Sequence, residues 1–151
     1  MKNILILSNF ESYSINATTY AMNFFSGQSC HFYFLNIVKV WEYTTDNLMT
    51  ASKDETIYDT ILSSSKSKLK KKIAYLENTY PEEDYTFTAL VDYDVFTDAI
   101  KQAVKAYDID CVLMGSNGQS DFIERLFGSH RTRVVRKVDC PVFIIPDNYK
   151  Y

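Results

Sequence analysis

Three of the chain's four glycines fall in one short window, and their spacing suits a phosphate-binding loop. They are Gly115, Gly118 and Gly128, and Ser129 follows the last of them directly. Glycine lets the backbone approach a ligand closely and adopt a positive φ angle, which other residues reach only at a cost. The window also joins a strand-like run to a helix-like run, and backbone N–H groups at a helix N-terminus bind phosphate oxygens. The spacing therefore favours a bound phosphate.

This glycine pattern differs from the two commonest phosphate loops. It contains no Gly-Lys-Ser/Thr, so it is not a P-loop, and it is not Gly-x-Gly-x-x-Gly. We expect Gly115 to end a strand, Gly118 to complete a turn, and residues 119–127 to form a short helical flap with one apolar side. Arg131 would add a charge-assisted contact in the following turn. The alternative left open by spacing alone is that these glycines serve only turns and a helix start.

The elements that position this window alternate between strand and helix along the whole chain. Continuous apolar or β-branched runs predict strands over residues 4–7, 31–38, 85–91, 109–114 and 142–145. Helical spacing of apolar residues predicts helices that contain Ala17, Ile61, Ala99 and Val134. Ser12 is expected to cap the first helix, and residues 39–52 are expected to form a long connection. Because no repeat or linker interrupts the pattern, residues 1–151 are predicted to form a single domain.

Strands that alternate with helices of this length imply right-handed crossovers and a parallel sheet. The predicted fold class is therefore α/β, Rossmann-like: a doubly wound five-stranded parallel sheet with helices on both faces. In such sheets, ligands bind outside the carboxyl ends of the strands, where the strand order reverses. If the first and fourth strands flank that point, then Ser8 and Asn9 face Gly115 across one crevice.

The composition limits the partners and the cellular compartment that we expect for this protein. A net charge of −3 gives no electrostatic case for nucleic acid or an anionic membrane. The lysine run between residues 66 and 72 is predicted to be a solvated helix face rather than a nucleic-acid patch. No run is long enough for a signal peptide or a membrane span. Three cysteines without metal-ligand spacing are typical of free thiols in a reducing compartment, so we expect a cytoplasmic protein without a bound metal of its own.

Residues 112–145 resemble the C-terminal signature of the universal stress protein family. The similar motifs are Met114-Gly115-Ser116-Asn117-Gly118, Gly128-Ser129, Arg133-Val134-Val135-Arg136-Lys137 and Cys140-Pro141-Val142. The opening of the chain, residues 4–21, is similar to that family's first strand and helix. The resemblance implies a five-stranded α/β fold, frequent homodimers, and a subset of members that binds ATP through Gly-x2-Gly-x9-Gly-Ser/Thr. That motif is complete here, which indicates an adenine-nucleotide-binding stress-response or signalling module for ATP or AMP, with or without Mg²⁺.

The same resemblance implies which residues hold the nucleotide. Ile37 would line the adenine pocket, and the glycines and Ser129 would surround the phosphates and ribose. Asn9 stands where the family usually has an aspartate, and its amide still forms hydrogen bonds but accepts them less strongly. Arg131 either contacts phosphate or crowds the site. The full predicted set is Ser8, Asn9, Ile37, Met114, Gly115, Ser116, Gly118, Gly128, Ser129, His130 and Arg131.

Two other functions remain open. The first is an interaction protein that binds no nucleotide, in which Asn9 and Arg131 mark a lapsed site. The second is an enzyme with slow ATPase or autophosphorylation activity, for which Asp121 and Glu124 would hold Mg²⁺ or position water, although exposed flap charges explain them as well. Whichever function applies, the last strand, Val142 to Ile145, is apolar. An uncovered edge strand of this kind pairs readily with a second copy of the chain, so we expect a homodimer. The expected protein partner is unidentified.

Overall fold

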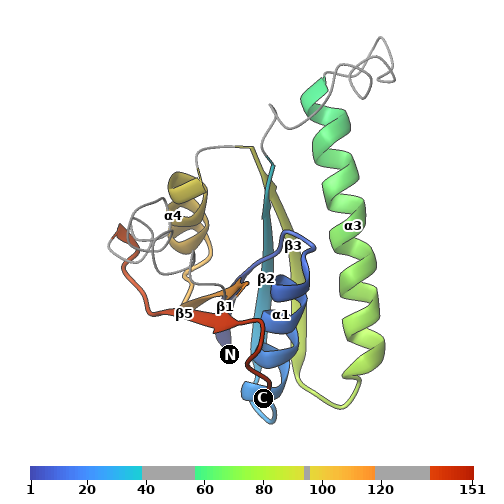
Figure 1. Cartoon of the computed structure of the whole chain (residues 1–151), viewed down its shortest axis with the longest axis vertical. Coiled ribbons are helices and arrows are strands. Elements are labelled where there is room, and N and C mark those ends of the chain that lie inside the picture. Colours follow the sequence, from blue (N-terminus) through green and yellow to red (C-terminus); the bar gives the residue numbers. More distant parts are fainter. Residues whose placement is uncertain (39–56, 94–95, 118–136) are drawn as a thin grey trace.

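The computed structural model describes residues 1–38, 57–93, 96–117 and 137–151. As far as residue 116 the strands and helices alternate as predicted (Figure 1), and the helix expected around Val134 lies outside the described residues. The strands are β1 (Lys2–Leu7), β2 (Cys30–Ile37), β3 (Tyr85–Asp92), β4 (Cys111–Ser116) and β5 (Val142–Pro146). The helices are α1 (Ser12–Phe24), α3 (Ile57–Thr79) and α4 (Phe96–Ala106).

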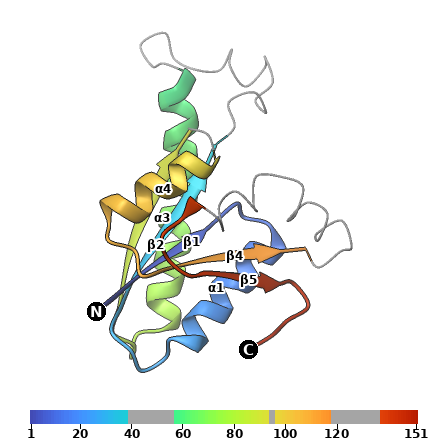
Figure 2. The same ribbon diagram turned by 90° about the vertical axis from the view of Figure 1, so that its left-hand side faces the viewer.

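The five strands form one parallel sheet in the order β3-β2-β1-β4-β5. β1 lies in the centre, with Ile4 opposite Phe32 of β2 on one side and opposite Cys111 of β4 on the other. The strand order reverses between β1 and β4, as Figure 2 shows from the side of the molecule. The predicted doubly wound α/β fold and the predicted position of its switch point are both confirmed.

Helices cover both faces of this sheet, which explains the continuous apolar runs. Side chains alternate along a strand. In β1, Ile4 and Ile6 therefore point toward the face covered by α1 and α3, and Leu5 points toward the face covered by α4. Leu69 of α3 is fully buried on the first face, and Ile100 of α4 is fully buried on the second. Figure 1 shows α4 on the side of the sheet opposite to α1 and α3.

Two local predictions were wrong. Ser12 is the first residue of α1 rather than its cap, and Glu11 occupies the N-cap position without a side-chain hydrogen bond. The Ser12 hydroxyl instead donates to Asp147 Oδ2 at 3.2 Å. Gly115 does not end β4, because the strand continues to Ser116 and pairs Gly115 with Ile145. The expected connection 39–52 and flap 119–127 lie outside the described residues.

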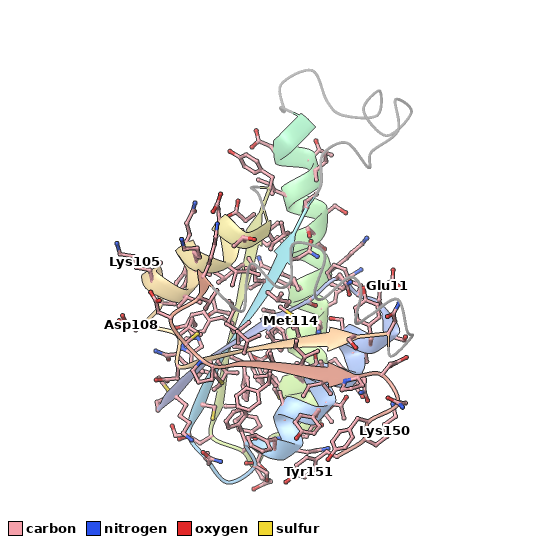
Figure 3. The ribbon with its side chains drawn as sticks, turned by 60° about the vertical axis from the view of Figure 1, so that its left-hand side comes forward. Glu11, Lys105, Asp108, Met114, Lys150 and Tyr151 are labelled. Carbon is pink, nitrogen blue, oxygen red and sulfur yellow. The ribbon has the colours of Figure 1, made fainter. Side chains whose placement is uncertain are left out.

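The C-terminal segment folds back along α1 and is held there by Asn16. The Asn16 Nδ2 donates to the carbonyls of Pro146 at 3.1 Å and Tyr149 at 2.9 Å. The Lys150 ammonium donates to Asn16 Oδ1 at 2.8 Å. The ring of Tyr151 packs edge-on against Tyr20 of α1. Figure 3 labels Lys150 and Tyr151, the last two residues of the chain.

α3 is amphipathic. Leu69 and Leu76 are buried against the sheet, whereas the lysines at positions 66, 68, 70 and 71 are exposed. Within the described ranges, no helix combines the length and the apolar character needed to cross a membrane. The one lysine of this helix that departs from the exposed pattern, Lys72, belongs to the site described next.

Candidate functional site

The carboxyl ends of β1, β2 and β4 and the first turn of α1 surround one pocket. Its lining consists of Leu7, Ser8, Asn9, Tyr13, Ser14, Leu35, Ile37, Met114 and Gly115. Figure 3 labels Met114 on β4 and Glu11 just before α1, on the two sides of this region. The pocket lies where the strand order reverses, which is the usual ligand position in an open α/β sheet.

Five sequence-predicted residues are brought together in this pocket: Ser8, Asn9, Ile37, Met114 and Gly115. Ser116 is adjacent but does not line it. The Ser116 hydroxyl is completely buried and has no hydrogen-bond partner among the described residues. The other predicted residues lie outside the described part of the chain: Gly118, Gly128, Ser129, His130 and Arg131.

Gly115 is required by the close approach of α1. A Cβ atom at this position would lie 2.1 Å from the carbonyl oxygen of Tyr13 and 2.5 Å from its carbonyl carbon. Both are backbone atoms, so no side-chain movement relieves the clash. Glycine here therefore serves helix-on-strand packing rather than a turn, and this packing places the first turn of α1 against the pocket.

The loop between β1 and α1 is held by the side chain of Asn9. Its Oδ1 accepts a hydrogen bond from the backbone N–H of Glu11 at 3.2 Å, and its Nδ2 donates to the hydroxyl of Tyr13. An amide supplies both an acceptor and a donor, which a carboxylate does not. Phe10, between them, has a φ of 66°, a conformation that costs a non-glycine residue about 1 kcal/mol or more. Its ring packs against the core, which offsets that cost.

Below the pocket, side chains donate hydrogen bonds to the carbonyl groups of Leu7, the last residue of β1, and of Ser8, which follows it. Asn36 Nδ2 donates to the carbonyl of Ser8 at 2.5 Å, and the hydroxyl of Ser65 on α3 donates to Asn36 Oδ1. The Ser14 hydroxyl donates to the carbonyl of Leu7 at 3.1 Å. Asn36 and Ser65 are buried, so these bonds fix the pocket floor to both α1 and α3.

Lys72 of α3 reaches under the same floor. Its Nζ donates to Ser8 Oγ at 3.1 Å and to Thr18 Oγ1 at 2.8 Å, and it lies 4.7 Å from the centroid of the Phe34 ring. Burial lowers the pKa of this ammonium group from 10.5 to about 8. The prediction of a solvated lysine face was therefore wrong for this residue. Position 72 falls on the buried stripe of α3, three residues after Leu69, and that spacing is visible in the sequence.

The first turn of α1 also contributes residues that the sequence analysis missed. Tyr13 and Ser14 line the pocket, as do the apolar Leu7 and Leu35. The signal for Tyr13 is its place four residues after Asn9, at the start of a predicted helix. The described residues around the pocket supply an apolar slot with hydroxyl and amide groups at its edge, which is an arrangement for binding a ligand.

A family model that represents the universal stress protein family matches residues 1–146. The chain belongs to this family. A search of curated proteins finds no match.

Solved structures of universal stress proteins share the fold at low identity. One from Lactobacillus plantarum is 19% identical, with a TM-score of 0.66 over 95% of this chain and 97% of that one. A family protein from Arabidopsis thaliana with AMP bound is 17% identical, with a TM-score of 0.60 over 98% and 93%. A universal stress protein in complex with cAMP is 16% identical, with a TM-score of 0.59 over 97% and 98%.

In this universal stress protein, the described pocket is lined by apolar, hydroxyl and amide groups that could bind a ligand. Among the described residues, no three histidine, cysteine, aspartate or glutamate side chains gather in the manner of metal ligands. Cys30 and Cys111 are buried, and burial raises the pKa of the Cys111 thiol to about 11, which makes it unreactive. The pocket at the ends of β1 and β4 is therefore the feature of the described structure on which a function can be argued.

Proposed function

We propose that this universal stress protein binds an adenine nucleotide, ATP or AMP, in the pocket at the carboxyl ends of β1 and β4. The observation that carries the proposal is the convergence of Asn9, Ile37 and Gly115 on one pocket at the switch point. Gly115 is the first glycine of the complete Gly-x2-Gly-x9-Gly-Ser motif. Solved relatives of the same fold with AMP or cAMP bound support the same ligand class.

The chemistry of the lining suits a nucleoside. Leu35, Ile37 and Met114 offer an apolar slot for a base, and Asn9 and Tyr13 offer polar groups at its edge. The rest of the glycine motif, with Ser129, would supply the hydrogen-bond donors for phosphate. The buried hydroxyl of Ser116 supports a polar partner at the end of β4, because an unpartnered buried hydroxyl is costly.

Binding would act as a signal. A nucleotide that favours one of two conformations shifts their populations and changes the surface that a protein partner recognises. The proposed molecule is thus a single-domain, cytoplasmic stress-response module whose state follows nucleotide occupancy, and Mg²⁺ would enter only with ATP.

The nucleotide carried by the purified protein tests this proposal. We expect protein prepared without added nucleotide to release ATP, ADP or AMP in nearly stoichiometric amount on denaturation, as detected by anion-exchange chromatography with mass detection. Gly128→Val is expected to abolish binding while the far-ultraviolet circular dichroism stays that of a folded protein. The matched control is Gly27→Asn, at the glycine outside the motif, since Gly27 has a φ of 75° that asparagine tolerates. An empty wild-type protein with no affinity up to millimolar nucleotide would refute the proposal.

We also propose a homodimer that forms through β5. This strand lies at the edge of the sheet, and Phe143 on it is 40% exposed. Exposed edge strands pair readily, and a lysine on the edge opposes pairing. Phe143→Lys should therefore shift the protein toward monomer in sedimentation velocity, whereas Tyr75→Lys, at an exposed aromatic residue of α3, should not. Equal sedimentation of both variants and the wild type would exclude β5 as the interface.

A further inference from the structure

The ammonium group of Lys72 is largely buried beneath the pocket, and none of the described residues gives it an opposite charge. Its described hydrogen-bond partners are the hydroxyls of Ser8 and Thr18, and the ring of Phe34 lies 4.7 Å from Nζ. Burial lowers its pKa, and no carboxylate among the described residues contributes to that shift. Lys72 is thus a buried cation that is solvated by neutral groups.

Such an arrangement is costly to maintain. A buried charge destabilises a protein unless it is paired, and an apolar residue of similar size is often more stable in its place. Leu69, Ile73 and Leu76 form the apolar stripe of α3 around this position. A leucine or methionine at position 72 would continue that stripe, so packing alone does not explain a lysine.

Ser8 connects this cation to the pocket. An ammonium group only donates hydrogen bonds, so the Ser8 hydroxyl must accept from Lys72, and its own proton is left to donate to another acceptor. Ser8 also lines the pocket. The charge of Lys72 therefore lies directly behind the floor, whereas the polar side chains of Asn9, Tyr13 and Ser14 that line it are uncharged amide and hydroxyl groups.

We propose that Lys72 is the counter-charge for an anionic ligand in this pocket and that the ligand supplies the negative charge that Lys72 lacks. Lys72 acts through Ser8 and through space, as a positioning residue rather than a direct ligand. The proposal rests on the proposed function and deepens it: the site selects a phosphorylated nucleotide over the neutral nucleoside, and it does so more strongly when Lys72 is protonated.

The surroundings of Lys72 explain why we expect its ammonium group to lose its proton near pH 8. Ser8 just after β1, Phe34 of β2 and Thr18 of α1 contact its ammonium group. The ammonium of Lys68, one turn earlier on α3, lies instead 5.7 Å from the ring of Phe10. The described elements packed here also carry other charged or titratable groups: Lys2 on β1, Cys30, His31 and Tyr33 on β2, Tyr85 and Asp92 on β3, Glu11 before α1, Tyr13 and Tyr20 on α1, and Asp59, Lys66, Lys70, Lys71, Tyr75 and Glu77 on α3. The described partners of the Lys72 ammonium include none of these groups.

The test compares AMP with adenosine in wild type and Lys72→Met. From about pH 7 to about pH 9, the wild-type affinity for AMP should fall by about three- to ten-fold as Lys72 loses its proton. The AMP phosphate is already ionised over most of this range. At about pH 7, Lys72→Met should bind AMP about three- to ten-fold more weakly than the wild type, with no further pH dependence and unchanged adenosine affinity. Lys71→Met removes an exposed charge from the same helix and should behave as the wild type.

Other results would overturn the inference. If Lys72→Met lost affinity for AMP and adenosine equally, Lys72 would have a structural role only. If the pH dependence of AMP affinity persisted in that variant, another group would be responsible for it. Calorimetry on the wild type alone, in buffers with different heats of ionisation, gives a reading that needs no variant. AMP binding at about pH 8 should take up protons, because the anion raises the pKa of Lys72, and the absence of uptake would refute the proposal. A wild type that binds neither compound would instead refute the proposed function itself.

Discussion

Gly115→Ala is expected to destabilise the fold by about 3 kcal/mol or more, although it adds a single methyl group. The added Cβ would lie 2.1 Å from the carbonyl oxygen of Tyr13, so α1 must move away from β4. Urea unfolding measures the effect. Gly27→Ala is the matched control: nothing lies within 4 Å of its Cβ, and its φ of 75° alone costs alanine about 1 kcal/mol. A Gly115→Ala protein as stable as the Gly27→Ala protein would contradict the steric argument.

The same substitution should also disturb the pocket, since Tyr13, Ser14 and Gly115 all line it. We therefore expect Gly115→Ala to lose nucleotide affinity together with stability. This differs from Gly128→Val, for which we expect lost affinity in a protein that remains folded. The comparison separates a glycine that α1 packing requires from a glycine that the ligand requires.

Lys72→Met is expected to raise the free energy of unfolding at about pH 7 by about 1–3 kcal/mol. Folding lowers the pKa of Lys72 from 10.5 to about 8, so the folded state binds this proton less tightly than the unfolded state does. Below about pH 8 both states are protonated and the full cost is present. Between about pH 8 and the unfolded pKa only the unfolded state retains the proton, so wild-type stability rises with pH. The lost bonds to Ser8 and Thr18 reduce the gain in the variant.

Urea unfolding at about pH 7 and about pH 9.5 tests this expectation. Because of Lys72, the wild type should gain about 2 kcal/mol over that range relative to Lys72→Met. Lys71→Met, which removes an exposed charge, should follow the wild type. Parallel pH profiles for the wild type and Lys72→Met would show that Lys72 is not a buried cation. With the expected result, Lys72 would strengthen anion binding and at the same time lower the free energy of unfolding, a combination that is common at functional sites.

The sheet and its switch point could be predicted because the signals are local. A continuous apolar run such as Ile4 to Leu7 is typical of a strand covered on both faces, and the alternation of strands with helices then favours parallel pairing. The switch-point rule placed Asn9 opposite Gly115 without any ligand, and the structure brings both to one pocket.

The reasons for individual residues were harder to predict, because they depend on contacts between distant segments. Gly115 was correctly placed at the site, but its requirement comes from Tyr13, which lies far away in the sequence. Lys72 was grouped with its exposed neighbours because charge type outweighed its position on the buried stripe. The acceptors that allow its burial are Ser8, just after β1, and Thr18 of α1, and no local pattern in α3 reveals them.

The strand order also determines when the fold can close during synthesis on the ribosome. β1 and α1 are translated first, yet β1 pairs with residues 111–113, and Asn16 of α1 forms hydrogen bonds with residues 146, 149 and 150. Until residues 111–113 emerge, one edge of the central strand is unpaired, and until residues 146–150 emerge, α1 lacks its contacts with the C-terminal segment. Unpaired strand edges and uncovered apolar surfaces are what chaperones bind. We therefore expect a chain that stops before β5 to leave the edge of β4 unpaired and α1 without its C-terminal hydrogen bonds.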